Sequence, residues 1–206
     1  MKTYTSREHF PEILPDTSTD YCWECGAVGP RQECSDERCF YVCSDCGARC
    51  ERFRTWSPTL RQSFDEHGRL VHYGSGMIVQ NERGEILLFL RRKYPFLYTI
   101  PGGHLDVGEE PSACAVRETE EEVAITPQDP RLIFEGVLED DPCPGGADIH
   151  YWYLYHAVRW EGSPSVMEEG VRLKWVVPEK IAFDDIVPPL RVLLCNDAVR
   201  TAIMNR

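Results

Sequence analysis

The chain lacks any apolar run long enough to cross a membrane. Spanning the hydrocarbon core takes about 20 consecutive apolar residues, and polar or charged side chains interrupt every apolar stretch before that length. The first twenty residues also lack the continuous apolar segment and cleavage site of a secretory signal, so we expect a polar arm there. These absences predict a protein of the cytoplasm with no membrane partner.

Positive charge is also scarce. The chain carries 22 lysines and arginines against 34 aspartates and glutamates, which gives a formal net charge of -12. Because a protein that covers a phosphate backbone needs a basic surface, this balance argues against nucleic acid as the main ligand. It is compatible with phosphate chemistry at a site where metal ions reverse the local field. The charge therefore indicates that any phosphate chemistry of this protein would depend on metal ions.

Cysteine, by contrast, is abundant. Of ten cysteines, seven lie between residues 22 and 50. Two Cys-x-x-Cys pairs are separated by 17 residues, a spacing typical of structural zinc sites, and each pair is followed by a glycine that permits a tight turn. The segment resembles a zinc ribbon, and a redox dithiol is the less favoured alternative. The expected ligands of a structural Zn²⁺ are Cys22, Cys25, Cys43 and Cys46.

The remaining cysteines have no assigned role. Three in the same segment are expected to be free thiols: Cys34, Cys39 and Cys50. A second metal site that borrows a histidine is the alternative for them, the candidates being His67 and His72. Three scattered cysteines are expected to be ordinary core or surface residues: Cys114, Cys143 and Cys195. Arginine and aromatic residues alternate in the module, so contact with RNA or another protein stays open.

Periodicity predicts the rest of the fold. Alternating residues at 73–80 and 85–92 predict a hairpin with a turn at Asn81–Gly84, and a glycine-rich loop precedes a helix from Pro111 to about Ala124. Three more strand-like runs and a closing helical segment follow, at 131–139, 148–158, 173–177 and 187–204. This order predicts an α+β or α/β sandwich with a mixed sheet between helices.

The chain is expected to divide into four parts. Residues 1–20 would be the polar arm, 21–50 the zinc-ribbon-like module and 71–206 the catalytic domain. Residues 51–70 would be a helical linker, with Ser57 and Pro58 beginning the helix and Gly68 ending it. A homodimer is compatible with the sequence.

Three carboxylates are clustered in the predicted helix. Glu118, Glu121 and Glu122 are spaced i, i+3, i+4, which places them on one helix face. Such a group repels itself unless a hard divalent cation binds it, and the turn at Gly102 and Gly103 can bring a backbone carbonyl to the same place. A solvated acidic surface is the simpler reading of the run taken alone.

The wider spacing decides between these readings. Gly103, Glu109 and the Arg117-Glu118 pair, followed by Glu121 and Glu122, resemble the Nudix box, Gly-x5-Glu-x7-Arg-Glu-U-x-Glu-Glu-x-Gly-U, where U is a bulky aliphatic residue. The chain departs from the pattern twice, with Thr119 at the first U and Ala124 at the second glycine. Neither departure removes an oxygen ligand.

The resemblance implies a Nudix α/β/α sandwich that hydrolyses the pyrophosphate linkage of a nucleoside diphosphate derivative with Mg²⁺ or Mn²⁺. By position, the metal ligands would be Glu118, Glu121, Glu122 and the Gly102 carbonyl. Glu109 and Arg117 would hold the box in shape. The general base would come from the box or from a later loop, where the candidates are Glu168 and Glu169.

Two alternatives remain beside this reading. A zinc ribbon ahead of the box resembles the NAD(H) pyrophosphatases, but the Ser-Gln-Pro-Trp array of that branch is missing after the box. A Nudix domain that only senses a nucleotide, with a zinc module that binds nucleic acid or protein, is the second. The aromatic run Tyr151, Trp152, Tyr153 and Tyr155 is expected to pack in the core rather than stack on a base.

Overall fold

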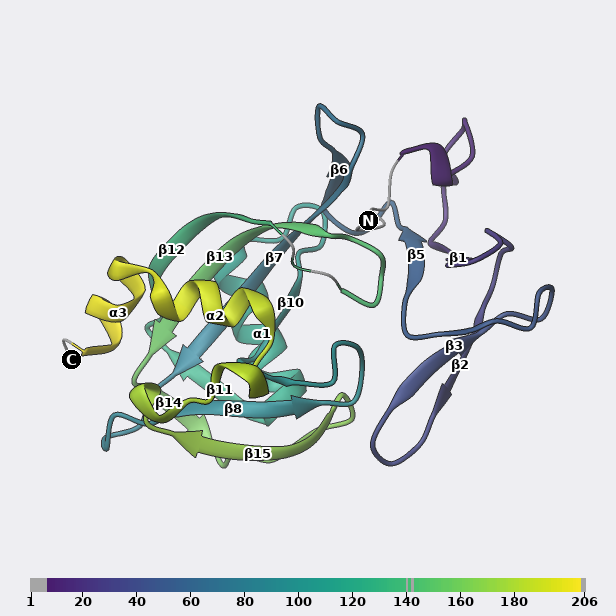
Figure 1. The fold of residues 1–206 in the computed structure, drawn as a ribbon. Helices are drawn as coiled ribbons and strands as arrows, with labels where there is room; N and C mark the ends of the chain where they lie inside the picture. The colour runs from purple at the N-terminus through teal and green to yellow at the C-terminus, as the bar shows by residue number, and fades with distance from the viewer. Residues whose placement is uncertain (1–6, 140, 142, 205–206) are drawn as a thin grey trace.

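A mixed sheet lies at the centre of the larger part of the molecule (Figure 1). The structure is a computed structural model that describes residues 7–139, 141 and 143–204. The sheet has the order β10-β7-β13-β12, with β6 pairing with β7, and β13 runs parallel to β7 while the other pairs are antiparallel. Its strands are β6 (Gln62–Phe64), β7 (Leu70–Val79), β10 (Gly102–His104), β12 (Arg131–Leu138) and β13 (Ile149–Ala157).

Helices cover both faces of this sheet. Helix α1 (Pro111–Val123) packs on one face, while α2 (Pro188–Cys195) and α3 (Asp197–Met204) pack on the other. The strand period of two separates the two cores: Met77 and Val79 of β7 belong to the cluster on the α1 side, and Ile78 to the cluster on the α2–α3 side. The expected α/β/α sandwich with a mixed sheet is confirmed.

The predicted hairpin at 73–92 is wrong in its pairing. The turn at Asn81–Gly84 forms, but β7 and β8 (Ile86–Arg91) enter different sheets and share a single bridge between Gln80 and Ile86. Strand β7 has β13 along one edge and β6 and β10 along the other, so no edge is left for β8. Instead β8 pairs with β9 (Tyr98–Thr99) and with β15 (Gly170–Val176). A separate two-stranded sheet is formed by β11 (Ile125–Gln128) and β14 (Arg159–Gly162).

The cysteine-rich segment forms two small sheets to one side of the sandwich (Figure 1). Strand β1 (Thr19–Cys22) pairs with β5 (Phe53–Trp56), and β2 (Arg31–Cys34), β3 (Cys39–Val42) and β4 (Arg49–Cys50) form the second sheet. Cys34 and Cys39 are joined by a disulfide at the tip of the β2–β3 hairpin. The expectation that these two are free thiols is therefore wrong, because the hairpin register places them opposite each other.

The predicted helical linker is also wrong. Residues 62–64 form β6, which pairs with the start of β7, and Gly68 (φ 74°) lies in the turn between the two strands. The cap signal of Ser57 and Pro58 is overridden because Phe64 packs with Trp56 and Phe10 in a small aromatic cluster. Phe10 follows the 3₁₀ helix η1 (Arg7–His9), so this stretch of the arm is packed rather than loose; residues 1–6 lie outside the described residues.

The closing segment is two helices instead of one. Asn196 is extended (φ -73°, ψ 129°), and its side-chain Oδ1 accepts the N–H groups of Ala198 and Val199 at the start of α3. Two 3₁₀ turns, η2 (Pro178–Lys180) and η3 (Phe183–Asp185), precede these helices. Among the described residues, no helix has the length and apolar character needed to cross a membrane.

Candidate active site and cysteine–histidine clusters

The box helix buries an acidic residue on its apolar face. Helix α1 begins at Pro111, where the missing N–H costs nothing, and its buried positions recur at helical spacing: Cys114, Ala115, Thr119, Glu122 and Val123. Thr119, at a position where the Nudix box has an aliphatic residue, satisfies its hydroxyl by donating to the Ala115 carbonyl at 2.6 Å. The helix ends at Ala124 in the left-handed conformation (φ 58°, ψ 34°).

Glu118 and Glu122 meet strand β10 at the floor of a cleft. The cleft has a volume of about 290 Å³, and both carboxylates line it beside Gly102 and Gly103. Glu122 Oε2 accepts the Gly102 N–H at 2.8 Å, and a Cβ built on Gly103 would lie 2.3 Å from Glu118 Oε1. A side chain at position 103 would therefore force the Glu118 carboxylate to move from this place.

Burial and mutual repulsion shift both carboxyl groups in the same direction. Glu122 is 6% exposed, and its burial, together with the charge of Glu118, raises its pKa well above the usual value. Burial also raises the pKa of Glu118, although Arg117 opposes the shift. A pair of buried carboxylates that destabilise each other's charge fits a divalent cation, which would remove the repulsion.

Arg117 ties the loop before the helix to the helix itself. Its guanidinium donates to both oxygens of Glu109 at 2.9 and 3.0 Å, to Glu118 Oε1 at 2.7 Å and to the His104 carbonyl at 3.3 Å. The hydrogen bond from Arg117 lowers the pKa of Glu109. Glu109 also accepts the Asp106 N–H, so one ion pair fixes the loop, strand β10 and the helix together.

The other predicted acidic residues differ in position. Glu121 is 59% exposed and lies 3.4 Å from Arg117 Nη1, outside the set of residues that line the cleft. Both loop candidates are exposed, but Glu169 lines the cleft and pairs with Lys93, whereas Glu168 does not line it. Glu120 is exposed and accepts a hydrogen bond from Thr126 Oγ1 at 2.7 Å.

Two cationic side chains of the cleft were missed by sequence reasoning. Arg91, at the end of β8, and Lys93 line the same cleft as the carboxylates, and Arg91 acts to lower the pKa of Glu122. The run Arg91-Arg92-Lys93 was the available signal, because it follows a strand directly. Of the aromatic run, Tyr155 is buried as expected, while Trp152 lines the cleft and donates to Asp141 Oδ2 at 2.6 Å.

The cysteine-rich module forms one wall of the cleft. Tyr41 and Phe53, whose ring centroids are 4.2 Å apart, line it from β3 and β5. Arg52 fastens the module to the larger domain through Asp148 at 2.8 Å and the carbonyls of Cys143 and Ala147, both at 2.9 Å. The module therefore contributes directly to the candidate active site.

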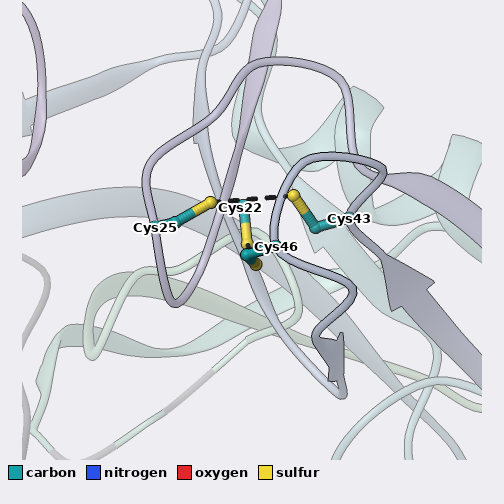
Figure 2. A group of neighbouring side chains, drawn as sticks. All are labelled: Cys22, Cys25, Cys43 and Cys46. Carbon is teal, nitrogen blue, oxygen red and sulfur yellow. Dashed lines mark hydrogen bonds between the residues drawn. The ribbon is translucent and has the colours of Figure 1, made fainter.

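Four cysteines of the module converge as the sequence predicts. The Sγ atoms of Cys22 and Cys46 are 3.8 Å apart and those of Cys25 and Cys43 are 3.7 Å apart (Figure 2). Tetrahedral Zn²⁺ with Zn–S bonds of about 2.3 Å would separate its thiolates by about 3.8 Å. The two turns are equivalent, with the N–H groups of Gly26 and Gly47 donating to the first cysteine of each pair at 3.0 Å. This geometry fits a small zinc module.

A second group of nitrogen and sulfur side chains, unassigned by sequence reasoning, lines the cleft itself. His72, His104, Cys143 and His150 bring one ligand atom each to within 4.8 Å of the others. The sequence expectation treated Cys143 as an ordinary cysteine and paired His72 only with the cysteines of the module. No spacing signal connects these four residues, because they come from three strands and a loop.

Comparison with known proteins agrees with this geometry. The model of the NUDIX domain matches residues 70–196. The 8-oxo-dGTP diphosphatase of Escherichia coli (strain K12) is 34% identical over 114 residues, which are 54% of this chain and 84% of that protein. Human diphosphoinositol polyphosphate phosphohydrolase 3-alpha is 26% identical over 155 residues, 72% of this chain and 84% of that protein.

Solved structures share the fold. The MutT NUDIX hydrolase from Burkholderia pseudomallei superposes with a TM-score of 0.53 at 22% identity, covering 63% of this chain and 96% of that one. The matched family model spans more than half of the chain and includes the whole box helix. The chain therefore belongs to the NUDIX domain family of pyrophosphohydrolases.

Proposed function

We propose that the chain hydrolyses the pyrophosphate linkage of a nucleoside diphosphate derivative with Mg²⁺ or Mn²⁺ bound at the box helix. The observation that carries the proposal is the acidic pair of the box helix, the buried Glu122 and the partly buried Glu118, in a cleft that Gly102, Arg91 and Lys93 also line. The ligands of the ions would be Glu118, Glu121, Glu122 and the Gly102 carbonyl. Bound ions would neutralise the diphosphate and lower the pKa of a water molecule.

The remaining chemistry belongs to the side chains of the cleft. Arg91 and Lys93 would orient the diphosphate by charge, since both line the cleft together with Glu118 and Glu122. Glu169, which pairs with Lys93, is the proposed general base because it is the loop glutamate that lines the cleft. Glu109 and Arg117 would position the ligands without touching the substrate.

The cysteine-rich module supports a nucleotide substrate more than it supports an RNA-binding role. Tyr41, Phe53 and Trp152 give the cleft an aromatic wall suited to a nucleotide base. Three of the arginines of this segment are engaged within the protein: Arg52 with Asp148, Arg54 over Trp23 and Arg49 over Phe40. Arg31 stays exposed. We therefore place the module's role in forming the cleft, with Zn²⁺ on Cys22, Cys25, Cys43 and Cys46. The proposed division has a module at 19–56, longer than the predicted 21–50 because β1 pairs with β5, and a domain at 71–206. A cytoplasmic location is also part of this proposal.

The NAD(H) pyrophosphatase reading remains the second candidate. Its support is the zinc-ribbon-like module ahead of the box, and the missing Ser-Gln-Pro-Trp array weighs against it. The relatives named above are described as acting on 8-oxo-dGTP and on diphosphoinositol polyphosphates. A panel of these compounds with NADH, ADP-ribose, dinucleotides and nucleotide sugars, with products identified by chromatography, separates the candidates.

The test is Glu122→Gln assayed on that panel with Mg²⁺ titrated. We expect at least about a 10²-fold loss of turnover, because the change removes a charge that holds metal. Stability should be unchanged or slightly higher, since a buried carboxylate that Glu118 repels is neutralised. Glu120→Gln is the matched control on the exposed face and should keep its activity. Full activity of Glu122→Gln, or of protein treated with EDTA, would overturn the proposal.

A further inference from the structure

We propose that His72, His104, Cys143 and His150 form a second, structural zinc site at the wall of the catalytic cleft. The ligand atoms are His72 Nδ1, His104 Nε2, His150 Nε2 and Cys143 Sγ. His104 Nε2 lies 3.2 Å from each of the other two nitrogens, and Cys143 Sγ lies 3.7 Å from His72 Nδ1. Tetrahedral Zn²⁺ would separate two nitrogen ligands by about 3.3 Å and a nitrogen from a thiolate by about 3.6 Å.

Hydrogen bonding alone leaves this cluster incompletely satisfied. A neutral imidazole nitrogen either donates one hydrogen bond or accepts one. His104 Nε2 lies at the same distance from His72 Nδ1 and from His150 Nε2. It can form a hydrogen bond with one of these two nitrogens, and the other then has no hydrogen bond from His104. His72 and His150 are 1% and 3% exposed, so bulk water does not reach them readily. A cation at the centre accepts a lone pair from all four side chains and removes the conflict.

The fold holds the four ligands from separate elements. His72 on β7 and His150 on β13 are directly paired in the parallel register, so their side chains share one face of the sheet. His104 belongs to β10, the other neighbour of β7, and Cys143 belongs to the loop between β12 and β13. Three adjacent strands and a loop thus meet at one point, as expected for a bound ion that fastens non-local segments.

The surroundings of the cluster match those of a zinc-bound histidine. In a zinc-bound histidine, the ring nitrogen that does not bind the metal typically contacts a carboxylate, which fixes the tautomer and the orientation of the ring. His150 Nδ1 lies 3.1 Å from Asp141 Oδ2, which also accepts the Trp152 indole N–H at 2.6 Å. Asp141 is itself 6% exposed, so its carboxylate is buried between these two partners. The carboxylate is therefore placed to orient His150 toward the ion.

The ligand set selects the metal class. Three imidazoles and one thiolate suit Zn²⁺ and not Mg²⁺, which prefers oxygen ligands. Four protein ligands with three of them buried make a closed site, which is the structural rather than the catalytic arrangement. The ion would therefore be distinct from the hydrolytic metals at Glu118 and Glu122, although both sites border the same cleft.

The position of Cys143 indicates what the ion would hold in place. The loop that carries Cys143 accepts two backbone hydrogen bonds from strand β5. The Phe53 N–H donates to the Pro144 carbonyl at 2.9 Å, and the Thr55 N–H donates to the Gly145 carbonyl at 3.0 Å. Arg52 binds the Cys143 carbonyl from the module side. Zinc at this cluster would fix the surface on which the cysteine-rich module docks, together with strand β10 that carries Gly102 and Gly103.

The test is the zinc content and coordination of the full-length protein, purified under reducing conditions and dialysed against Mg²⁺. Two zinc ions per chain are expected, one for each of the two clusters. X-ray absorption at the zinc edge should show histidine scattering together with sulfur. One zinc per chain with sulfur ligands alone would overturn the proposal, and this measurement on the unaltered protein requires no variant to fold.

Variants assign the second ion to its ligands. Cys143→Ser should lower the zinc content from two ions to one and remove the histidine contribution from the X-ray absorption spectrum. Cys195→Ser, at an exposed free cysteine, is the matched control and should keep both ions. Glu122→Gln should also keep both. If Glu122→Gln loses the second zinc while Cys143→Ser keeps it, that zinc occupies the carboxylates, and the proposed site is wrong.

Discussion

The module and the Nudix domain are stabilised in different ways. The two large apolar clusters, centred on the sheet and its covering helices, consist of residues of the domain. The module contributes Tyr21 and Trp56 to a third, small cluster that also includes Phe10, Phe64 and Leu70. Chains below about 40 residues usually need a metal, a disulfide or a partner to fold. The module therefore relies on its cysteines and on docking, whereas the domain relies on its core.

The largest effect is expected from removing two thiolates of the module. Cys22→Ser with Cys25→Ser should abolish zinc binding there and unfold the module, because binding of structural zinc supplies about 10–16 kcal/mol of folding free energy in small modules. The domain should stay folded and keep part of its activity, since its cores are separate. Limited proteolysis with mass spectrometry should show cleavage confined to residues 19–56.

The free cysteine Cys50 in the same module provides the control for this experiment. Cys50→Ser should leave the proteolysis pattern unchanged. If the double variant unfolds the domain together with the module, the two parts form one folding unit and the contrast between them fails.

The next largest effect is expected at the contact between the two parts. Arg52→Ala removes an ion pair with Asp148 and two hydrogen bonds to backbone carbonyls. The side chain of Arg52 is 13% exposed and that of Asp148 is 11% exposed. Loss of one partner from a buried ion pair costs about 3–5 kcal/mol. Chemical denaturation should therefore show a lower midpoint or two separate transitions. Arg31→Ala is the control, because the Arg31 side chain is 75% exposed and its ion pair with Glu33 should contribute little to stability. If both variants lowered the midpoint by the same amount, the result would argue against a docked module.

The smallest effect is expected from substitutions at residues with positive φ, which occur in both the module and the domain. Gly26 and Gly47 of the module have φ of 75° and 73°, whereas Ala124 of the domain has φ of 58°. A Cβ in this conformation is strained, so Ala124→Gly should raise the free energy of unfolding by about 1 kcal/mol. Gly26→Ala, which meets no neighbouring atom, should lower the stability of the module by about 1 kcal/mol. Loss of stability in Ala124→Gly would contradict this reading.

Strand and helix positions were predictable where the pattern is local, and pairing was not. Helix α1 starts at Pro111 as predicted, and the runs at 131–139 and 148–158 are strands. The hairpin prediction failed because β13, brought in from far along the chain, and β10 occupy the edges of β7. The linker prediction failed for a similar reason, because tertiary packing of Phe64 outweighed the cap signal of Ser57.

The sequence by itself determined the sites whose residues are close together in the chain. Helical spacing brings Glu118 and Glu122 together, and two Cys-x-x-Cys turns are enough to converge four thiolates. Only the tertiary structure decided that Arg91, Lys93 and Glu169 line one cleft with those carboxylates, and that three histidines and Cys143 meet in the same cleft. Pairing β7 with β10 and β13 creates that second cluster, and strand pairing between distant segments leaves no periodic signal in the sequence.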